Sequence, residues 1–317
     1  STQPSWFYVM VIVTVLLLTE LKHTFTEFAQ RMKNDEMITL AKFLAISGII
    51  LPMLPHKNLI PDINLTPYSI WLATVVVSGI SYLSYLLKRY VFHESGTLVS
   101  GIIGGLYSST ATISVLARKS RKASEQEATE YVAAMLLAVS MMFLRFMILI
   151  LIFSREIFLS IYPYLLIMSV VSAIVGWFIH SRQKLPKDTS VESEEDDSSN
   201  PLEFKVALIF AVLFVVFTVL THYTLVYAGT SGLNLLSFVS GFSDITPFIL
   251  NLLQNTGSVA VLIITACSMQ AIVSNILVNM FYALFFAGKR SKLRPWILGG
   301  FGAVIACNLV LLLFFYL

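Results

Sequence analysis

Polar residues that could bind an ion or a solute occur in the middle of two apolar segments, residues 97–117 and 233–253. The first segment contains Ser108, Ser109 and Thr110, and the second contains Ser243, Asp244 and Thr246. Hydroxyl and carboxylate groups at a broken membrane helix can hold Na⁺ or accept a proton, while the N–H groups of a helix start favour an anion. We therefore expect these residues to bind a solute or its coupling ion. Alternatively, they only satisfy the backbone at the break.

Asp244 is the only one of eighteen acidic residues that lies inside an apolar stretch. A carboxylate at that depth costs several kcal/mol unless it is paired, protonated or bound to an ion. Asp244 is therefore predicted to bind the coupling cation or proton. It could also be a helix cap, because Pro247 favours a helix start just after Asp244 or Thr246.

Arg145 is the only basic residue deep inside a predicted membrane segment. It could bind an anionic solute or neutralise Asp244 in a structural pair. Asn275 and Asn279 are four residues apart, so they share one helix face and are predicted to point inward. They are further candidates for the binding site, although amides also join membrane helices to one another.

Glycine and proline mark the predicted breaks in the two polar-centred segments. We expect hinge or packing roles for Gly104, Gly105, Gly241 and Pro247. Gly101 and Gly105 form a GxxxG pair, for which Ser237 and Gly241 are the counterparts. Such pairs are typical of close helix packing more often than of ligand contact.

The sequence has no phosphate-binding loop, paired catalytic carboxylates, nucleophile elbow or zinc motif. The two cysteines, Cys267 and Cys307, both lie in apolar runs and are predicted to be small buried residues. We therefore predict no enzyme, no catalytic residue, no metal site and no cofactor apart from Na⁺ or H⁺ as a coupling ion. ATP-driven transport and nucleic-acid binding are not expected either.

The composition indicates a membrane protein with many crossings. Of the 317 residues, 57% are hydrophobic and 12% are charged, and the mean hydropathy is +0.81. Soluble proteins carry about 25% charged residues. Ten apolar segments are long enough to cross a bilayer, so the fold class is predicted to be all-α and polytopic, with the lipid bilayer as a partner. The segments are roughly 6–20, 37–54, 69–91, 97–117, 129–153, 157–180, 203–228, 233–253, 258–287 and 295–317.

The distribution of Lys and Arg favours two segments that do not cross. If all ten segments cross, the loops on the two sides hold ten and nine basic residues, so neither side is enriched. If 97–117 and 233–253 are re-entrant hairpins, the count becomes seventeen against two. Basic loops stay in the cytoplasm. We therefore predict about eight crossings and two hairpins, with both termini outside; ten full crossings are the alternative.

An acidic stretch, residues 181–202, divides the chain into two parts and is predicted to be a cytoplasmic linker. Residues 1–68 form an N-terminal part with helices and an amphipathic connection. The first repeat is 69–180 with hairpin 97–117, and the second is 203–317 with hairpin 233–253.

The two hairpin segments align without gaps at an offset of 136 residues. Six of twenty-four positions are identical, among them Gly105 with Gly241 and Thr110 with Thr246. An odd number of crossings separates the two repeats, so they are predicted to be inverted. Inverted repeats with broken helices at the midplane are typical of secondary transporters.

The stretch GGLYSSTATISVLARKSR resembles a bacterial membrane domain of unknown function that commonly follows an MgtC/SapB-type domain. The residues that carry the resemblance are Gly104, Gly105, Ser108, Ser109, Thr110, Ala111, Ala117 and Arg118, with Asn200-Pro201, Gly241, Asp244 and the Leu-Pro pairs in 50–55. The resemblance runs from about residue 35 to the end and implies the bacterial inner membrane. The MgtC domain with its acidic signature is absent from this sequence, so magnesium is not carried over.

Three functions fit these features. The leading hypothesis is a secondary transporter of a small anionic solute, coupled to a cation or proton, with the binding site at the hairpin tips. A passive channel for ions or small solutes and a non-transporting regulator or scaffold are the alternatives. Inverted-repeat carriers are often dimers, so a homodimer is one expected assembly.

Overall fold

The computed structural model describes five separate residues between 12 and 22, then residues 34–61, 63–92, 96–182, 204–254, 259–288 and 293–316. The chain divides into two compact units, residues 1–50 and 51–317. The first predicted segment, 6–20, and nearly all of the predicted linker 181–202 lie outside the described residues. Most of the helix α2 (Asn34–Met53) belongs to the first unit, and residues 36–53 are apolar enough to cross a membrane.

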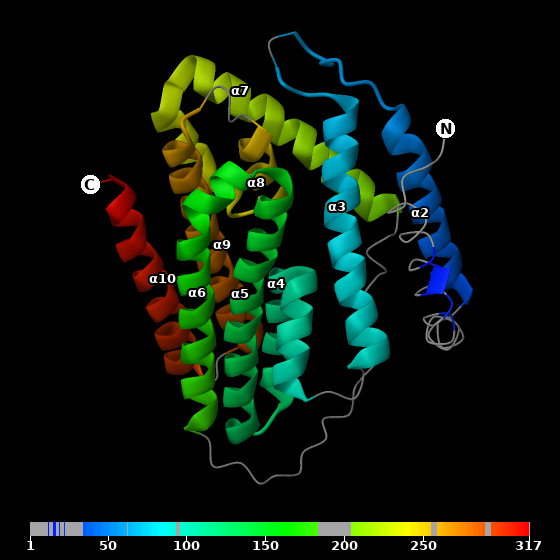
Figure 1. Cartoon of the computed structure of the whole chain (residues 1–317). Helices are drawn as coiled ribbons and strands as arrows, with labels where there is room; N and C mark the ends of the chain where they lie inside the picture. The colour runs from blue at the N-terminus through cyan, green and yellow to red at the C-terminus, as the bar shows by residue number, and fades with distance from the viewer. Residues whose placement is uncertain are drawn as a thin grey trace. The chain divides into compact units, whose positions relative to one another are not determined.

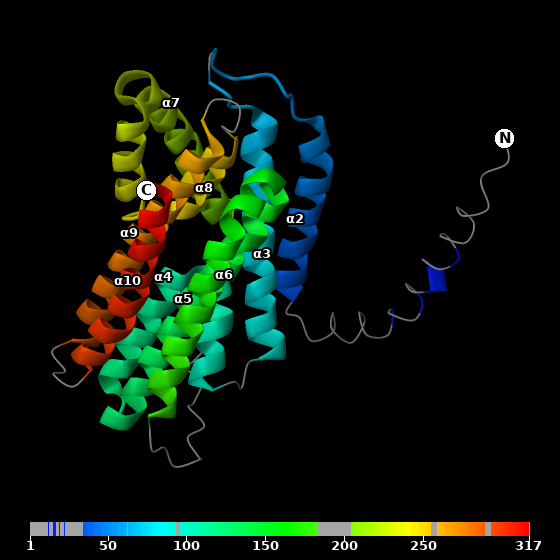
Figure 2. The ribbon, with the colours of Figure 1, turned by 60° about the vertical axis from the view of Figure 1, so that its left-hand side comes forward.

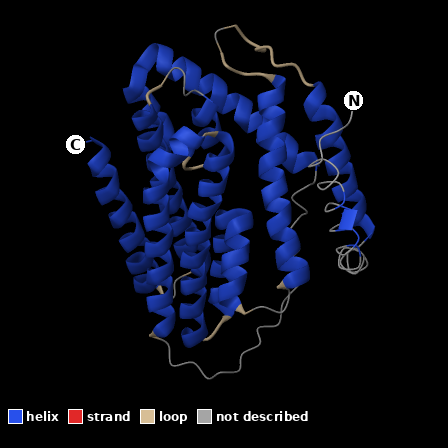
Figure 3. Ribbon diagram, viewed as in Figure 1, coloured by secondary structure: helices blue, strands red, loops and turns tan. Residues whose placement is uncertain are grey.

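The described residues form helices and loops, with a single isolated β-bridge between Ile60 and Ile63 (Figure 3). Eight helices, α2 included, are long and apolar enough to cross a membrane. The protein is therefore an all-α, multi-pass membrane protein, as predicted. The helices of the second unit are α3 (Pro67–Leu86) with the short π-helix η1 (Leu87–Val91), α4 (Thr97–Lys122), α5 (Glu125–Phe153), α6 (Arg155–Ser181), α7 (Phe204–Ser240), α8 (Ile245–Gln254), α9 (Val261–Ala287) and α10 (Arg294–Tyr316).

Hydroxyl side chains begin several of these helices. Thr66 and Ser69 form a capping box at the start of α3, and Ser124 and Glu127 form another at the start of α5. Ser154 alone separates α5 from α6, and its side chain accepts a hydrogen bond from the Ile157 N–H. Each cap satisfies an N–H group that has no partner inside its helix.

Helix α4 is a hairpin of two arms, because its helical geometry is interrupted at Ser108 (φ −158°, ψ 108°). A Cβ on Gly104 would lie 2.5 Å from the Thr112 Oγ1. Residues eight apart lie about 12 Å apart along a continuous helix, so the chain must turn back between them. Figure 1 shows α4 ending at about half the height of α5 and α6.

The first arm of α4 runs in the same direction as α5. Gly101 packs against the backbone of Ala134, and Gly105 packs against that of Ala138. The second arm leads directly into α5 and therefore runs the opposite way. This arrangement matches the hairpin predicted for residues 97–117.

The second hairpin consists of the end of α7 and the whole of α8. Gly229 interrupts α7 with a positive φ (φ 60°, ψ −151°), a backbone conformation that glycine adopts readily. Residues 230–240 form the first arm, a turn follows at 241–244, and α8 is the second arm. The break therefore lies where the sequence predicted it, between Gly241 and Pro247.

The first arm of this hairpin packs along α9 as the first arm of α4 packs along α5. The Cys267 thiol donates a hydrogen bond to the Asn234 Oδ1 (3.3 Å), and Gly241 packs against Ser274. Both pairs are separated by 33 residues, as are Gly101 with Ala134 and Gly105 with Ala138. The contacts therefore repeat at the 136-residue offset.

The two repeats run in opposite directions. Near its start, α9 meets the start of α6, where the Thr265 hydroxyl donates to the Ser160 Oγ (3.4 Å). At its other end, Gly288 lies beside Arg121, just before α5 begins. Helices α5 and α9 are therefore antiparallel, and Figures 1 and 2 show the hairpins entering the bundle from opposite ends. That the hairpins are re-entrant in a bilayer remains a prediction.

Candidate functional site

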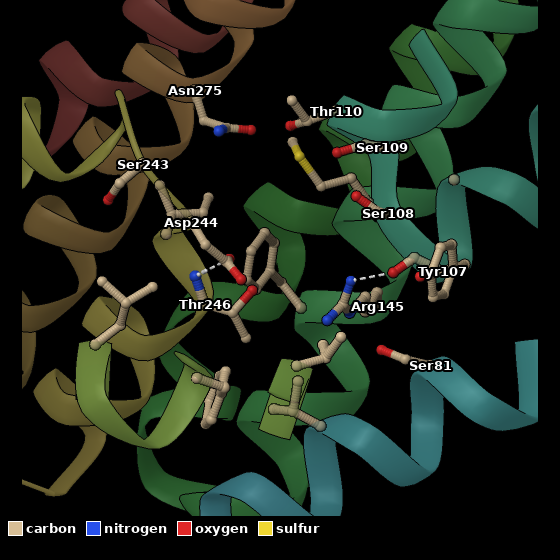
Figure 4. Close-up of a pocket in the computed structure, with 18 of the residues that line it drawn as sticks. Ser81, Tyr107, Ser108, Ser109, Thr110, Arg145, Ser243, Asp244, Thr246 and Asn275 are labelled. Carbon is tan, nitrogen blue, oxygen red and sulfur yellow. Dashed lines mark hydrogen bonds between the residues drawn. The ribbon is translucent and has the colours of Figure 1, made fainter. Parts of the chain in front are cut away.

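The tips of the two hairpins face a common cavity of about 470 Å³ inside the second unit. Figure 4 shows the labelled side chains of both tips around it, together with Arg145 from α5 and Asn275 from α9. Eight of the nine residues predicted to bind a solute or ion line this cavity. They are Ser108, Ser109, Thr110, Arg145, Ser243, Asp244, Thr246 and Asn275.

At the first tip, the break in α4 frees a backbone carbonyl. The Ser108 Oγ accepts a hydrogen bond from the Ala111 N–H (3.3 Å) and so caps the second arm. In an unbroken helix that N–H would bond to the Tyr107 carbonyl. Here the Arg145 Nη1 donates to the Tyr107 carbonyl instead (2.7 Å). Arg145 thus supports the broken backbone with one of its nitrogens.

At the second tip, Asp244 begins α8. Its Oδ1 accepts a hydrogen bond from the Thr246 N–H (2.9 Å), so Asp244 and not Thr246 is the cap. Pro247 is the third residue of α8, within the first turn, where a missing N–H leaves no hydrogen bond unmade. The Asp244 side chain is nevertheless exposed, and Figure 4 shows it among the residues that surround the cavity. Capping therefore leaves it accessible to a ligand.

The long helix beside each tip donates a side chain to a carbonyl of the break. Arg145 of α5 does so at Tyr107, and the Asn275 Nδ2 of α9 donates to the Gly241 carbonyl (3.3 Å). The Ser243 hydroxyl donates to the Ser240 carbonyl (3.1 Å). Polar side chains in both repeats thus satisfy the backbone that the breaks expose, so the backbone role considered for them applies here.

Arg145 and Asp244 face the cavity without forming an ion pair with each other among the described residues. The charge of Asp244 still favours the charged form of the half-buried guanidinium. The Arg145 Nε is buried and has no hydrogen-bond partner. The guanidinium therefore has a donor that the protein leaves unused.

Asn279 is the one predicted binding residue that does not line the cavity. It is fully buried, and its Nδ2 donates to the Asn275 Oδ1 (3.2 Å). The two amides share one face of α9, as their spacing predicted. Asn279 therefore contacts a cavity residue without reaching the cavity itself.

The predicted glycines are packing positions. A Cβ on Gly105 would lie 2.6 Å from backbone atoms of Ala138, and one on Gly241 would overlap the Ser274 side chain. Gly104 lies against Thr112 of the opposite arm. Only glycine allows these approaches of the hairpins to α5, to α9 and between the arms.

Several cavity residues were not singled out from the sequence. Tyr107 takes part through its backbone, which its residue type could not reveal. Ser78 and Ser81 of α3 line the cavity, and their spacing of three in an apolar helix was the available signal. Helix α7 contributes an apolar wall, spaced as one helix face, with Val206, Ile209, Phe210 and Leu213.

The fold and the cavity define a class of multi-pass membrane proteins with two opposed helical hairpins that meet at a polar site. The chain belongs to the family described as Domain of unknown function (DUF4010), whose model matches residues 75–287. This range includes every residue that lines the cavity. A protein of Aquifex aeolicus (strain VF5), titled "Uncharacterized protein", is 26% identical over 224 residues, which are 70% of this chain and 96% of that protein. No solved structure matches the chain.

Proposed function

We propose that the protein is a secondary transporter of a small anionic solute, coupled to the movement of Na⁺ or H⁺, with its site at the two hairpin tips. The observation that supports this most is the cavity of about 470 Å³ where both tips meet inside an apolar bundle. Polar groups and irregular backbone at such depth are tolerated where they line a watery cavity, and there they mark solute and ion pathways.

The charged groups of the cavity give each ligand a place. The second arm of α4 begins at the cavity with the neutral cap Ser108, and Arg145 lies beside it. A helix start and a guanidinium both favour an anion. Asp244 on the other tip supplies the carboxylate for the cation or proton. The proposal involves no enzymatic step and no cofactor other than this coupling ion.

Two other functions use the same structure differently. A passive channel needs the polar cavity but no alternating access, and a regulator or scaffold needs neither transport nor the tip residues. The inverted repeats favour a carrier, because alternation between two equivalent states is what such repeats provide. We further propose a location in the bacterial inner membrane with both termini outside and linker 181–202 in the cytoplasm, a homodimeric assembly, and kinship with MgtC/SapB-type proteins through the motifs at 104–118.

Counterflow in liposomes tests the proposal. The purified protein is reconstituted with an unlabelled organic anion inside, and the same radiolabelled anion is added outside in trace amount. A carrier transiently accumulates the label above its equilibrium level, whereas a channel only equilibrates it and a scaffold moves none. Accumulation that depends on Na⁺ or on a pH gradient supports the proposal; equilibration without accumulation contradicts it in favour of the channel.

A further inference from the structure

We infer that the cavity binds a monovalent organic anion with an apolar body together with one monovalent cation, so that each transport cycle moves no net charge. This inference rests on the proposed transport function. It specifies the class of solute and the ratio of solute to coupling ion.

The charge of the cavity lining leads to this ratio. Among the described residues that line the cavity, Arg145 is the only basic one and Asp244 the only acidic one, so their formal charges cancel. An uncompensated charge inside an apolar bundle is costly. One monovalent anion and one monovalent cation keep the total at zero. A divalent anion would require a second cation, for which the lining provides no second carboxylate.

The geometry keeps the two protein charges available to separate ligands. The Arg145 Nη1 is tied to the Tyr107 carbonyl of the first tip, and the Asp244 Oδ1 is tied to the Thr246 N–H of the second. These bonds hold the side chains on opposite hairpins, where no direct ion pair joins them. The unpartnered Arg145 Nε can donate to a carboxylate or sulfonate.

The wall formed by α7 indicates the shape of the solute. Val206, Ile209, Phe210 and Leu213 recur at the spacing of one helix face and all line the cavity. Ile209 remains 51% exposed, so its side chain has surface left to contact a solute. An apolar body placed against this wall loses contact with water, which favours binding. The cavity thus combines one anion-binding group with an apolar surface.

Binding can be measured with three sulfonates, which stay charged and therefore do not leak through lipid as neutral acids. Benzenesulfonate carries one charge on an apolar ring, benzene-1,3-disulfonate carries two charges on the same ring, and methanesulfonate carries one charge without the ring. Thermal unfolding of the purified full chain should show benzenesulfonate binding at least about tenfold more tightly than either of the others. Equal or tighter binding of the disulfonate would overturn the inference.

The ratio is tested by counterflow of benzenesulfonate in liposomes that carry a potassium diffusion potential of either sign. We expect rates that do not change with the sign of the potential. Counterflow whose rate follows the potential would overturn the one-to-one ratio and leave the transport function intact. Absence of counterflow for all three anions, in spite of binding, would instead contradict the transport function on which the inference rests.

Two neighbouring residues of α7 provide a matched control for the apolar wall. Ile209 and Leu208 are both 51% exposed, but only Ile209 lines the cavity. Ile209→Ala should weaken benzenesulfonate binding about threefold or more and leave methanesulfonate binding unchanged, because only the ring contacts this side chain. Leu208→Ala should change neither. Equal effects of the two variants would show that the wall does not contact the solute.

Discussion

At the residue scale, the two hairpins begin their second arms with different groups at equivalent positions. Ser108 caps the second arm of α4, and Asp244, which is 136 residues later, caps α8. A neutral hydroxyl leaves the positive end of its helix without a negative charge, whereas a carboxylate supplies one. The tips are therefore unlike: the first, beside Arg145, suits an anion, and the second suits a cation.

Asp244→Asn separates the capping role from the proposed cation role. Asn caps helices about as well as Asp, so the thermal unfolding temperature should stay close to that of the unchanged protein. The negative charge is lost, so uphill accumulation driven by Na⁺ or H⁺ should disappear. Asp244→Ala is the comparison: it should also lose about 1 kcal/mol of stability. Accumulation that persists in Asp244→Asn would show that this carboxylate does not bind the coupling ion.

Arg145→Gln removes the positive charge of the cavity but keeps an amide that can donate to the Tyr107 carbonyl. A hydrogen bond to a charged group contributes about 1.5–3 kcal/mol. Anion binding should therefore weaken by a factor of about 10 to 100 in a direct binding assay. Arg145→Lys keeps the charge without the planar fork of donors, so its binding should fall between the two. Unchanged affinity in Arg145→Gln would assign Arg145 to the support of the backbone alone.

Most of the candidate site could be predicted from the sequence because charged and hydroxyl residues are rare inside membrane helices. Asp244, Arg145 and the tip hydroxyls are conspicuous for this reason. Tyr107 contributes a carbonyl and α7 an apolar face, and both are chemically the same as dozens of neighbours. Only the three-dimensional arrangement distinguishes them. The capping role of Asp244 was one of two predicted alternatives, and both can hold together.

At the scale of elements, glycines allow each hairpin to lie against a long helix. Gly105 meets Ala138 of α5, and Gly241 meets Ser274 of α9, at the same separation of 33 residues. Close approach of backbones is a main source of helix association in membranes, where lipid is as apolar as the side chains. The position of each tip therefore depends on a residue without a side chain.

Gly105→Ala should destabilise the protein, because the new Cβ would lie 2.6 Å from the Ala138 backbone. Overpacking of this kind costs about 1–3 kcal/mol, which thermal unfolding in detergent can measure. Gly79→Ala in α3 is the matched control, since nothing lies within 4 Å of its added methyl group. That variant should be neutral or slightly stabilised. Equal loss in both would mean that the hairpin does not pack against α5 in this way.

The breaks in the helices could be predicted because glycine, serine, aspartate and proline cluster at the middle of the segments and not at their ends. The kink at Gly229 also falls between the predicted segments 203–228 and 233–253. The contacts between elements could not be predicted, because they depend on which residue faces which. The 33-residue separation of the glycine contacts was recognisable only from the structure.

At the scale of the whole molecule, the repeats of the second unit are antiparallel and the hairpins come from opposite ends (Figures 1 and 2). This arrangement gives a carrier two related ways to open its site, one to each side of the membrane. The distribution of Lys and Arg predicts which side is cytoplasmic, namely the side of the base of the first hairpin. The fold alone does not contain this information, since it has no membrane.

Cysteine accessibility tests the opposed hairpins most directly. Single cysteines replace Gly96 and Arg121 at the base of the first hairpin, or Thr230 and Ala260 at the base of the second, and all four positions are exposed. The background lacks Cys267 and Cys307. With a membrane-impermeant thiol reagent, we predict that the first pair reacts from the cytoplasm and the second pair from outside. If the two members of either pair react from opposite sides, that segment crosses the membrane and the opposed-hairpin account is wrong.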